Sequence, residues 1–554
     1  MTGDAGGVDR DGQLRALIMD VDLTVPAILE RAERHFAGKA VISRSAGGVL
    51  DTYSYGEVAD RVRRLGAALQ GLGVREGDRV ASVAWNSHRH LELYFAVPSI
   101  GAVLHTANFR LAPDELRYCL AHGGAEVIFC DPDHLAVVRE IAADLPHVRH
   151  LVAMDAPAVE PSSNDASYED LLKTDRVPRL PALDERSAAT LCYTSGTTGR
   201  PKAVTYSHRG LALLALTLCT TDVLALGEDD TALVNVPMFH ANAWCLPYGA
   251  TMCGATQVLP GPAPAPHDLA TLIDEYRVTY AAAVPTVLMG MLDDARSHGH
   301  DLASLRLVGS GGAALPTSLV NAMRDAGVNI RQGWGMTETG PVATMSWVKS
   351  DKRSLPLDEQ TRLLVKQGTP LPFVSLRVVD DRGTELPWDG TSTGELEIRG
   401  PWVASDYFKD HVEHQWHDGW MRTGDVVTID SDGCIEIVDR TKDLIKSGGE
   451  WISSLALEDA LTKHPRVVEA AVVAMIDPVW QERPAAFVIA SGGEPPTEDE
   501  LREFLAASLP KWWLPDRFLF VNEIAKTSVG KLNKKVLREQ LKVETGGESE
   551  GAVR

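Results

Sequence analysis

Residues 193–202 read Tyr193-Thr-Ser-Gly-Thr-Thr-Gly-Arg-Pro-Lys202, and this stretch decides how the rest of the sequence is interpreted. An apolar run over residues 188–192 precedes it, and a helical pattern over residues 211–219 follows it. Glycines let a backbone turn tightly against a ligand, and successive amides with Thr and Ser hydroxyls can then bind phosphate oxygens. The spacing differs from the Walker pattern, which disfavours a P-loop NTPase. Composition alone would favour a Ser/Thr/Gly linker that carries one lysine.

The sequence around this loop alternates between strand-like and helix-like segments. Residues 79–84 and 127–130 are short apolar runs that resemble buried strands. Leu269, Leu272, Ile273 and Tyr276 share one helical face behind Asp268 as a possible N-cap; a strand candidate over 278–284 and a helix opened by Pro285 follow. This alternation predicts an α/β fold in which helices pack on largely parallel sheets.

The last hundred residues have the pattern of a separate α+β unit. Ser454 is a candidate cap of a helix, residues 467–475 form a strand pattern, and Thr497 with Glu500 has capping-box spacing. We therefore predict a large N-terminal domain over residues 1–440 and a small C-terminal domain over residues 441–554. The Gly/Glu-rich tail after Val543 is expected to be disordered.

The overall composition excludes several classes of protein. The chain has 554 residues, of which 44% are hydrophobic, and a formal net charge of −22. That charge argues against nucleic acid or an anionic membrane surface as the main partner. Residues 1–13 lack the apolar core of a signal peptide, and polar residues interrupt the apolar stretch 211–226, which is expected to be a buried helix rather than a membrane span. Seven cysteines without a C-x-x-C pair favour a reducing, cytoplasmic location.

Five further motifs follow the first one along the chain. They are Gly309-Ser-Gly-Gly-Ala-Ala-Leu315, Gly333-Trp-Gly-Met-Thr-Glu-Thr339, Arg422-Thr-Gly-Asp425, Asp439-Arg-Thr-Lys-Asp443 and Thr527-Ser-Val-Gly-Lys531. Together with residues 193–202, and in this order, they resemble the motifs of the adenylate-forming superfamily. That superfamily includes acyl-CoA synthetases, luciferases and the adenylation domains of peptide synthetases.

The resemblance implies an ATP site that is built from most of these motifs. The ATP-binding residues that it implies are Thr194, Ser195, Gly196, Thr197, Thr198, Gly199, Lys202, Gly311, Gly312, Ala313, Gly333, Trp334, Gly335, Met336, Thr337, Asp425, Arg440 and Lys531.

Each of the central motifs offers side chains that suit its implied role. Trp334 stands where the family usually has Tyr, and its ring is suited to stacking on adenine. Glu338 is a hard oxygen ligand for Mg²⁺, with the Thr194 hydroxyl as its partner near the triphosphate. Asp425 can accept hydrogen bonds from ribose hydroxyls, and Arg440 can donate to ribose or to the α-phosphate.

The C-terminal motifs imply a mobile small domain. Lys531 matches the catalytic lysine of the family, whose charge can neutralise the α-phosphate and the attacking carboxylate together. Lys442 matches the hinge about which the small domain rotates, and a hinge need not touch substrate. Lys446, in the glycine-containing segment 446–453, is a further candidate catalytic contact, and Glu450 a second contact to linker or nucleotide.

The acyl pocket indicates the subfamily. Residues 237–247, Pro-Met-Phe-His-Ala-Asn-Ala-Trp-Cys-Leu-Pro, together with residues 446–454 closely resemble bacterial medium- and long-chain fatty-acyl-CoA synthetases. The resemblance implies that Trp244 gates the fatty-acid tunnel and that His240 lies beside the carboxylate as a catalytic residue. A core-packing role for Trp244 is the alternative.

Some residues depart from the family pattern. Ala203 replaces the glycine that usually ends the phosphate loop, Ala525-Lys526 replaces Pro-Lys, and residues 405–408 differ from common versions. His411, His414 and His417 recur every third residue and complete no zinc signature, so we expect a solvated helical face there.

The sequence therefore predicts an AMP-forming acyl-CoA synthetase. A carboxylate would react with Mg·ATP to give acyl-AMP and pyrophosphate, and CoA would then displace AMP; no enzyme nucleophile is needed, because the mixed anhydride is already activated. The expected partners are a medium- or long-chain fatty acid or another bulky hydrophobic carboxylate, ATP and CoA, with Mg²⁺ as cofactor, a possible homodimer, no nucleic acid and no integral membrane association. Transfer to a carrier protein and a non-catalytic nucleotide or lipid sensor remain as alternatives.

Overall fold

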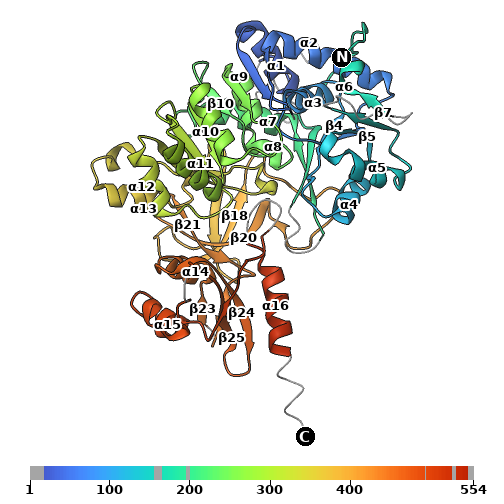
Figure 1. Cartoon of the computed structure of the whole chain (residues 1–554). Coiled ribbons are helices and arrows are strands. Elements are labelled where there is room, and N and C mark those ends of the chain that lie inside the picture. Colours follow the sequence, from blue (N-terminus) through green and yellow to red (C-terminus); the bar gives the residue numbers. More distant parts are fainter. Residues whose placement is uncertain are drawn as a thin grey trace, which may run out of the picture.

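The computed structural model describes residues 18–45, 47–154, 165–194, 200–448, 450–492, 495–526 and 532–546. A large N-terminal domain is followed by a smaller C-terminal domain, which lies below it in Figure 1. Residues 195–199 of the phosphate loop, Lys531 and the end of the tail lie outside the described residues. The predicted α/β class is confirmed, because the two largest sheets are mainly parallel.

The first large sheet has nine strands. Its six central strands run parallel, and strands at both edges add antiparallel pairs. In spatial order the strands are β16 (Thr369–Pro370), β15 (Thr344–Met345), β14 (Asn329–Trp334), β13 (Leu307–Ser310), β12 (Tyr280–Ala283), β10 (Thr231–Leu233), β11 (Thr256–Leu259), β1 (Ala40–Arg44) and β2 (Leu50–Ser54).

The second large sheet has seven strands, and all of its neighbouring pairs except β8 with β9 are parallel. The turn between β8 and β9 contains the phosphate-loop motif. In spatial order the strands are β7 (Asp165–Ser167), β6 (His150–Ala153), β5 (Ala125–Cys130), β3 (Arg79–Val83), β4 (Val103–Thr106), β8 (Ala188–Tyr193) and β9 (Ala203–Ser207).

A third sheet, which is fully antiparallel, lies between the parallel sheets and the small domain in Figure 1. The sequence pattern does not predict it as a separate sheet. It consists of β17 (Ser375–Val379), β18 (Gly394–Arg399), β20 (Trp420–Ile429), β19 (Trp416–His417) and β21 (Ile435–Arg440). Its register places Asp425 directly opposite Arg440.

The small domain is built on a fourth sheet, with helices on it. The sheet consists of β23 (Glu450–Ile452), β22 (Ile445–Ser447), β25 (Gln481–Ala490), β24 (Val467–Asp477) and β26 (Arg517–Phe520). Its helices are α14 (Ser454–Thr462), α15 (Glu498–Ala506) and α16 (Lys534–Gly546). Lys534 of α16 pairs with the buried Glu458 of α14 at 2.7 Å, which attaches α16 to the sheet's helical layer.

The helices of the large domain cover its two parallel sheets. They are α1 (Val25–Phe36), α2 (Tyr55–Gly71), α3 (His88–Ser99), α4 (Pro113–Gly123), α5 (Leu135–Ala143), α6 (Tyr168–Leu171), α7 (His208–Leu218), α8 (Ala241–Trp244), α9 (Leu246–Cys253), α10 (Pro266–Glu275), α11 (Pro285–His298), α12 (Thr317–Asp325) and α13 (Leu357–Leu364). No helix within the described residues has the length and apolar character needed to cross a membrane. All seven cysteines are free thiols.

Several element boundaries differ from the sequence prediction. Helix α10 begins at Pro266, so Asp268 lies inside the first turn, where its carboxylate accepts the Ala265 N–H at 2.8 Å. Ser453 rather than Ser454 caps α14, and Thr497 with Glu500 forms the predicted capping box of α15. Helix α7 ends at Leu218, within the apolar stretch expected to be helical. The predicted helix through His411, His414 and His417 is wrong, because that segment is irregular and enters β19; α16 continues past Val543 to Gly546.

Candidate active site

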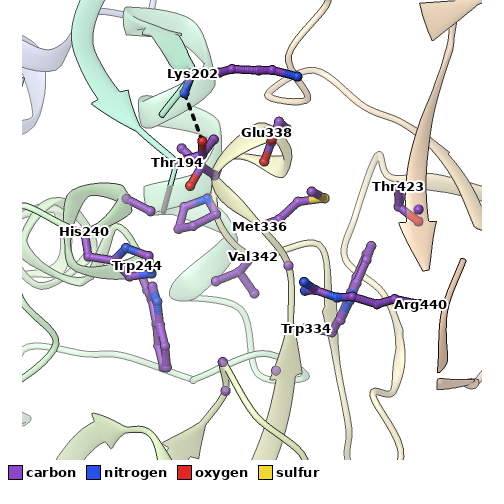
Figure 2. Close-up of a pocket in the computed structure, with 18 of the residues that line it drawn as sticks. Thr194, Lys202, His240, Trp244, Trp334, Met336, Glu338, Val342, Thr423 and Arg440 are labelled. Atoms are coloured by element: carbon purple, nitrogen blue, oxygen red, sulfur yellow. Dashed lines mark hydrogen bonds between the residues drawn. The ribbon is translucent and has the colours of Figure 1, made fainter. Parts of the chain in front are cut away.

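One cavity of about 470 Å³ lies where the carboxyl ends of β8, β12, β13 and β14 meet. Ligands bind outside the carboxyl ends of parallel strands in α/β folds, because loops rather than helices close the sheet there. The motif residues that line this cavity are Thr194, Lys202, His240, Trp244, Gly311, Gly312, Gly333, Trp334, Gly335, Met336, Thr337, Glu338, Arg440 and Lys442. Segments far apart in the sequence thus converge on one space (Figure 2).

The first wall of the cavity is a pair of glycine-containing strand ends. Ser310 of β13 pairs with Gln332 of β14, so Gly311 and Gly333 lie side by side just beyond. A side chain at Gly335 would place its Cβ 1.9 Å from the Pro341 carbonyl oxygen. Only glycine fits that position, and the close approach of the two backbones leaves the ring of Trp334 beside the cavity.

Trp334 is part of a polar chain that runs from the buried Asp425 to the exposed Arg440. Its indole Nε1–H donates to Asp425 Oδ2 at 2.9 Å, and Arg440 Nε lies 3.2 Å from Asp425 Oδ1. Both carboxylate oxygens of Asp425 are therefore engaged, and the side chain is 5% exposed. Trp334 and Arg440 line the cavity in front of Asp425, which itself does not. Asp425, the residue that was expected to bind ribose, therefore lies behind Trp334 and Arg440 rather than on the cavity wall.

A second group of polar side chains surrounds Glu338, which also lines the cavity. The Tyr407 hydroxyl donates to Glu338 Oε1 at 2.6 Å, and Lys202 Nζ lies 4.9 Å above the Tyr407 ring. Burial and the neighbouring Glu338 charge raise the pKa of Tyr407 well above its usual value, so the hydroxyl stays a proton donor. The Thr194 hydroxyl accepts the Lys202 N–H at 3.1 Å, the bond drawn in Figure 2.

The segment that carries Tyr407 explains its position. The Ala404 N–H donates to the Glu338 carbonyl at 2.8 Å, and the Phe408 N–H donates to the Ala203 carbonyl at 2.8 Å. Residues 404–408 therefore bridge the Glu338 turn and the strand after the phosphate loop. The departure from the family pattern at residues 405–408 lies inside this bridge.

Trp244 is held by an unusual backbone turn. The five residues from Ala241 to Cys245 all have φ between 45° and 64°, the left-handed region that costs a non-glycine residue about 1–2 kcal/mol. Asn242 lies inside the turn with no exposed surface; its Nδ2 donates to Thr190 Oγ1 at 2.8 Å, and its Oδ1 accepts the Cys192 thiol at 3.5 Å. The turn is thereby fixed to β8, the strand that leads into the phosphate loop.

The cavity has an apolar arm on the side of Trp244. Leu218, Leu224, Leu246, Tyr280, Ala282, Val342 and Met345 line it together with Trp244. A Cβ on Gly311 would lie 3.2 Å from Cη2 of the Trp244 ring, so this ring packs directly against Gly311. His240 and Trp244 lie across the cavity from Trp334 and Arg440 in Figure 2, with Met336 and Val342 between them. The apolar arm and the polar region are parts of one space.

The small domain contributes to the rim of the same cavity. Leu532, the residue after Lys531, lines it together with Thr441 and Lys442. Burial and the adjacent Arg440 charge lower the pKa of Lys442. Arg538 of α16 donates to the Lys442 carbonyl at 3.0 Å, so the helix that follows Lys531 is attached to the predicted hinge residue.

Some predicted site residues do not line the cavity. Among the described residues these are Ala313, Asp425 and Lys446. Lys446 is exposed on β22 with its Nζ 5.4 Å from the Trp451 ring centre, and Glu450 is exposed on β23. Ser195, Gly196, Thr197, Thr198, Gly199 and Lys531 lie outside the described residues.

Other cavity residues were not predicted. Tyr407, Glu395, Arg422, Thr423 and His414 all line the cavity. Arg422 stood in a quoted motif without a role, and His414 was assigned to a solvated helix. The departure at residues 405–408 was the only signal for Tyr407.

Comparisons with known proteins agree with this architecture. The model of the AMP-binding enzyme family matches residues 29–408, and that of the AMP-binding enzyme C-terminal domain matches residues 456–531. A long-chain-fatty-acid–CoA ligase of Thermus thermophilus is 47% identical over 97% of this chain and 99% of its own, and a 3-methylmercaptopropionyl-CoA ligase of Ruegeria lacuscaerulensis is 41% identical over 95% and 98%. The crystal structure of the anthranilate CoA ligase AuaEII with anthranoyl-AMP superimposes with a TM-score of 0.84 at 26% identity, covering 95% of this chain and 99% of that one.

The fold and the site define an adenylate-forming enzyme. The chain belongs to the AMP-binding enzyme family, in the neighbourhood of the bacterial fatty-acyl-CoA synthetases. Its activity is AMP-forming acyl-CoA ligation, with ATP and CoA as co-substrates, as the resemblance of its motifs predicts. Neither alternative, transfer of the acyl group to a carrier protein or a sensor without catalysis, is needed to explain the fold and the relatives of this chain.

The Trp334–Asp425 hydrogen bond yields a first prediction. Trp334→Phe keeps an aromatic face but removes the N–H that holds Asp425. We expect the KM for ATP to rise about tenfold, because a hydrogen bond to a charged group contributes about 1.5–3 kcal/mol. Steady-state kinetics with varied ATP measure this. Trp402→Phe is the matched control, since the Trp402 indole is also buried but donates to the Val342 carbonyl and lies outside the cavity lining. An unchanged KM in Trp334→Phe would show that the bond does not position Asp425.

Proposed function

We propose that the polar region of the cavity binds ATP and that the apolar arm binds a medium- or long-chain or other bulky hydrophobic acid. The observation that carries this proposal is the continuity of the two regions around Gly311. Adenine stacks on Trp334 and ribose contacts Arg440, while the phosphates extend toward Lys202 and Thr194. The carboxylate then lies next to His240, where the two regions meet. Such placement supplies catalysis by orientation and charge neutralisation.

Glu338 and Thr194 have the chemistry of a Mg²⁺ site. Tyr407 donates to Oε1 of Glu338, no described residue bonds to Oε2, and Glu338 and Thr194 both line the cavity. Carboxylate and hydroxyl oxygens are the ligand types that Mg²⁺ prefers, usually with substrate phosphates. When bound, Mg²⁺ neutralises phosphate charge. Glu338 is only 5% exposed, so its side chain is held by its neighbours. The hydrogen bond from Tyr407 orients its carboxylate before an ion binds.

Glu338→Gln tests this assignment. The amide keeps the shape of the side chain but loses the charge, so we expect slower acyl-AMP formation and a several-fold higher Mg²⁺ requirement. Pyrophosphate release during a Mg²⁺ titration measures both. Glu413→Gln is the control, because Glu413 also lines the cavity but lies beside His414. Equal Mg²⁺ dependence in wild type and Glu338→Gln would exclude Glu338 from the site.

The acid itself is proposed from the apolar arm and from Trp244. The relatives are named for acids as different as long-chain fatty acids and 3-methylmercaptopropionate, so their names do not identify the acid. The proposal therefore rests on the residues that line the cavity of this chain. Trp244 packs between the apolar arm and Gly311, and this contact supports the proposal that it gates an acyl tunnel.

Trp244→Ala tests the gate. We expect the ranking of kcat/KM across straight-chain, aryl and 3-methylmercaptopropionate acids to change by about tenfold or more. The KM for ATP serves as the internal control and should change less than that ranking. A uniform loss for all acids with a lower melting temperature would instead support core packing, since a large-to-small change in a core costs about 3–5 kcal/mol.

The two half-reactions are proposed to use two orientations of the small domain. Residues 1–440 and 441–554 would be the two bodies, with Lys442 as the hinge between β21 and β22. Because Leu532 lines the cavity, the neighbouring Lys531 is proposed to act on the α-phosphate in the orientation of this structure. Lys446 and Glu450, exposed here, would face the active site only after rotation.

Substitutions at the lysine and at the hinge separate the two steps. Lys531→Ala should slow acyl-AMP formation by about 10²-fold or more, the scale of one lost transition-state contact. It should leave the reaction of supplied acyl-AMP with CoA largely intact. Lys442→Pro fixes φ at the hinge, so adenylation should persist and thioester formation should fail.

Single-turnover assays of each half-reaction decide between these outcomes. Lys535→Ala is the control for Lys531→Ala, since Lys535 is an exposed lysine of α16. Loss of the same half-reaction in both variants would reject the rotating-domain assignment while leaving the CoA ligase activity in place.

A further inference from the structure

A cluster of histidines and a carboxylate lies on α10 and α11, outside the lining of the catalytic cavity. His267 is in the first turn of α10, whereas Asp294 and His298 are one turn apart near the end of α11. The ligand atoms of these three residues all lie within 4.8 Å of one another. Nothing in the ligase reaction requires these residues.

Packing of the two helices brings the three residues together. Helices α10 and α11 lie against each other in Figure 1. A Cβ on Gly290 would lie 3.2 Å from the Pro266 ring, so the lack of a side chain at Gly290 lets the start of α10 pack closely against α11. Gly290, Asp294 and His298 follow at intervals of four residues, which places them along one helical face. The backbone therefore positions His267 beside Asp294.

The contacts within the cluster have the form of a chelating site. His267 Nδ1 lies 3.1 Å from Asp294 Oδ2, and His298 Nδ1 lies 3.0 Å from Asp294 Oδ1 and 3.1 Å from the backbone carbonyl oxygen of Asp294. Ligands of a tetrahedral Zn²⁺ lie about 2.0–2.1 Å from the ion, and therefore about 3.4 Å from one another. To share an ion, the two imidazoles would turn their nitrogens from these oxygens toward one point, and His298 Nδ1 would leave the Asp294 carbonyl.

A third imidazole stands next to the cluster. The His300 ring centre is 5.2 Å from that of His267 and 6.4 Å from that of His298. Its Nδ1 is 3.6 Å from Asp274 Oδ2, while its Nε2 is buried and has no hydrogen-bond partner among the described residues. The Asp274 carboxylate thus orients the His300 ring beside the cluster.

We propose that His267, Asp294 and His298 bind one divalent transition-metal ion of the zinc class, with His300 as a neighbouring imidazole outside the ligand set. Imidazole and carboxylate donors suit Zn²⁺ and Co²⁺ rather than Ca²⁺ or Mg²⁺, which prefer oxygen alone. The ion clamps the start of α10 to the end of α11. Between these helices in the chain lies β12, whose Tyr280 and Ala282 line the apolar arm of the cavity. The proposed metal site thus joins the two helices that precede and follow β12, a strand that lines the apolar arm.

Metal titration of the full-length enzyme tests the proposal. The protein is freed of any affinity tag, stripped with a chelator and titrated with Zn²⁺ against a chromophoric competitor, and with Co²⁺ by visible absorption. We expect one equivalent to bind, a tetrahedral Co²⁺ spectrum and a Zn²⁺-dependent rise in melting temperature. His298→Ala and Asp294→Asn should weaken binding about 100-fold or more, and His300→Ala about tenfold.

His411→Ala is the matched control. His411 is exposed and lies 3.2 Å from Asp406 in a pair of the same geometry, but without a second histidine. Its substitution should leave Zn²⁺ affinity unchanged. The side chains of His267 and His298 are 57% and 56% exposed, so their alanine variants should fold, and unchanged melting temperatures without metal verify this. Equal Zn²⁺ binding by wild type and His298→Ala, or an equal loss in His411→Ala, would overturn the proposal.

Discussion

The carboxylate of Asp425 connects the parts of the molecule that must act together on a nucleotide. One of its oxygens accepts the indole N–H of Trp334 at the end of a parallel strand, and the other faces Arg440 across the antiparallel third sheet. Lys442 lies two residues beyond Arg440. A buried carboxylate is costly unless it is paired, so the chain cannot move the wall formed by Trp334 independently of the strand that leads to the hinge. The position of the cavity wall at Trp334 and the start of the small domain are therefore set by one group.

A comparable constraint holds the acyl side of the cavity. The left-handed turn at residues 241–245 is unfavourable by itself, and the buried Asn242 amide keeps it in place through Thr190 of β8. Because β8 continues into the phosphate loop, the strand that carries Thr194 and the turn that carries Trp244 share one anchor. Local strain of this kind persists only where the surroundings determine it fully. Trp244, the proposed gate, and Thr194, the proposed phosphate contact, thus depend on the same strand.

The sequence predicted the class of fold and several of the segments that converge on the cavity, because the motifs are local. The capping box at Thr497 and the helix opened by Pro285 were predictable for the same reason. Contacts between distant segments were not. Nothing in the sequence indicates that Tyr407 reaches Glu338, or that Asp425 is occupied by the indole of Trp334.

Wrong predictions have equally physical causes. Helix α10 starts at Pro266 because proline fits the first turn, which leaves Asp268 to accept from inside the helix. The three histidines at 411, 414 and 417 have helical spacing, yet His414 has a φ of 65° and His417 belongs to β19. Spacing alone carries no information on such a turn.

Charge shows most clearly why local arrangement outweighs composition. A chain with a net charge of −22 has to bind ATP and CoA, which are both anions. Among the described residues the cavity is lined by five cations, namely Arg200, Lys202, Arg422, Arg440 and Lys442, and by three carboxylates, Glu338, Glu395 and Glu413. Arg422 pairs with Glu395, and Glu413 lies beside His414, whereas Arg200 and Lys202 line the cavity and form no ion pair within the described residues. A low-dielectric cleft strengthens the field of such groups, whereas salt screens distant surface charges within about 10 Å. The acidic net charge of the chain therefore does not prevent local cations from attracting an anion inside the cavity.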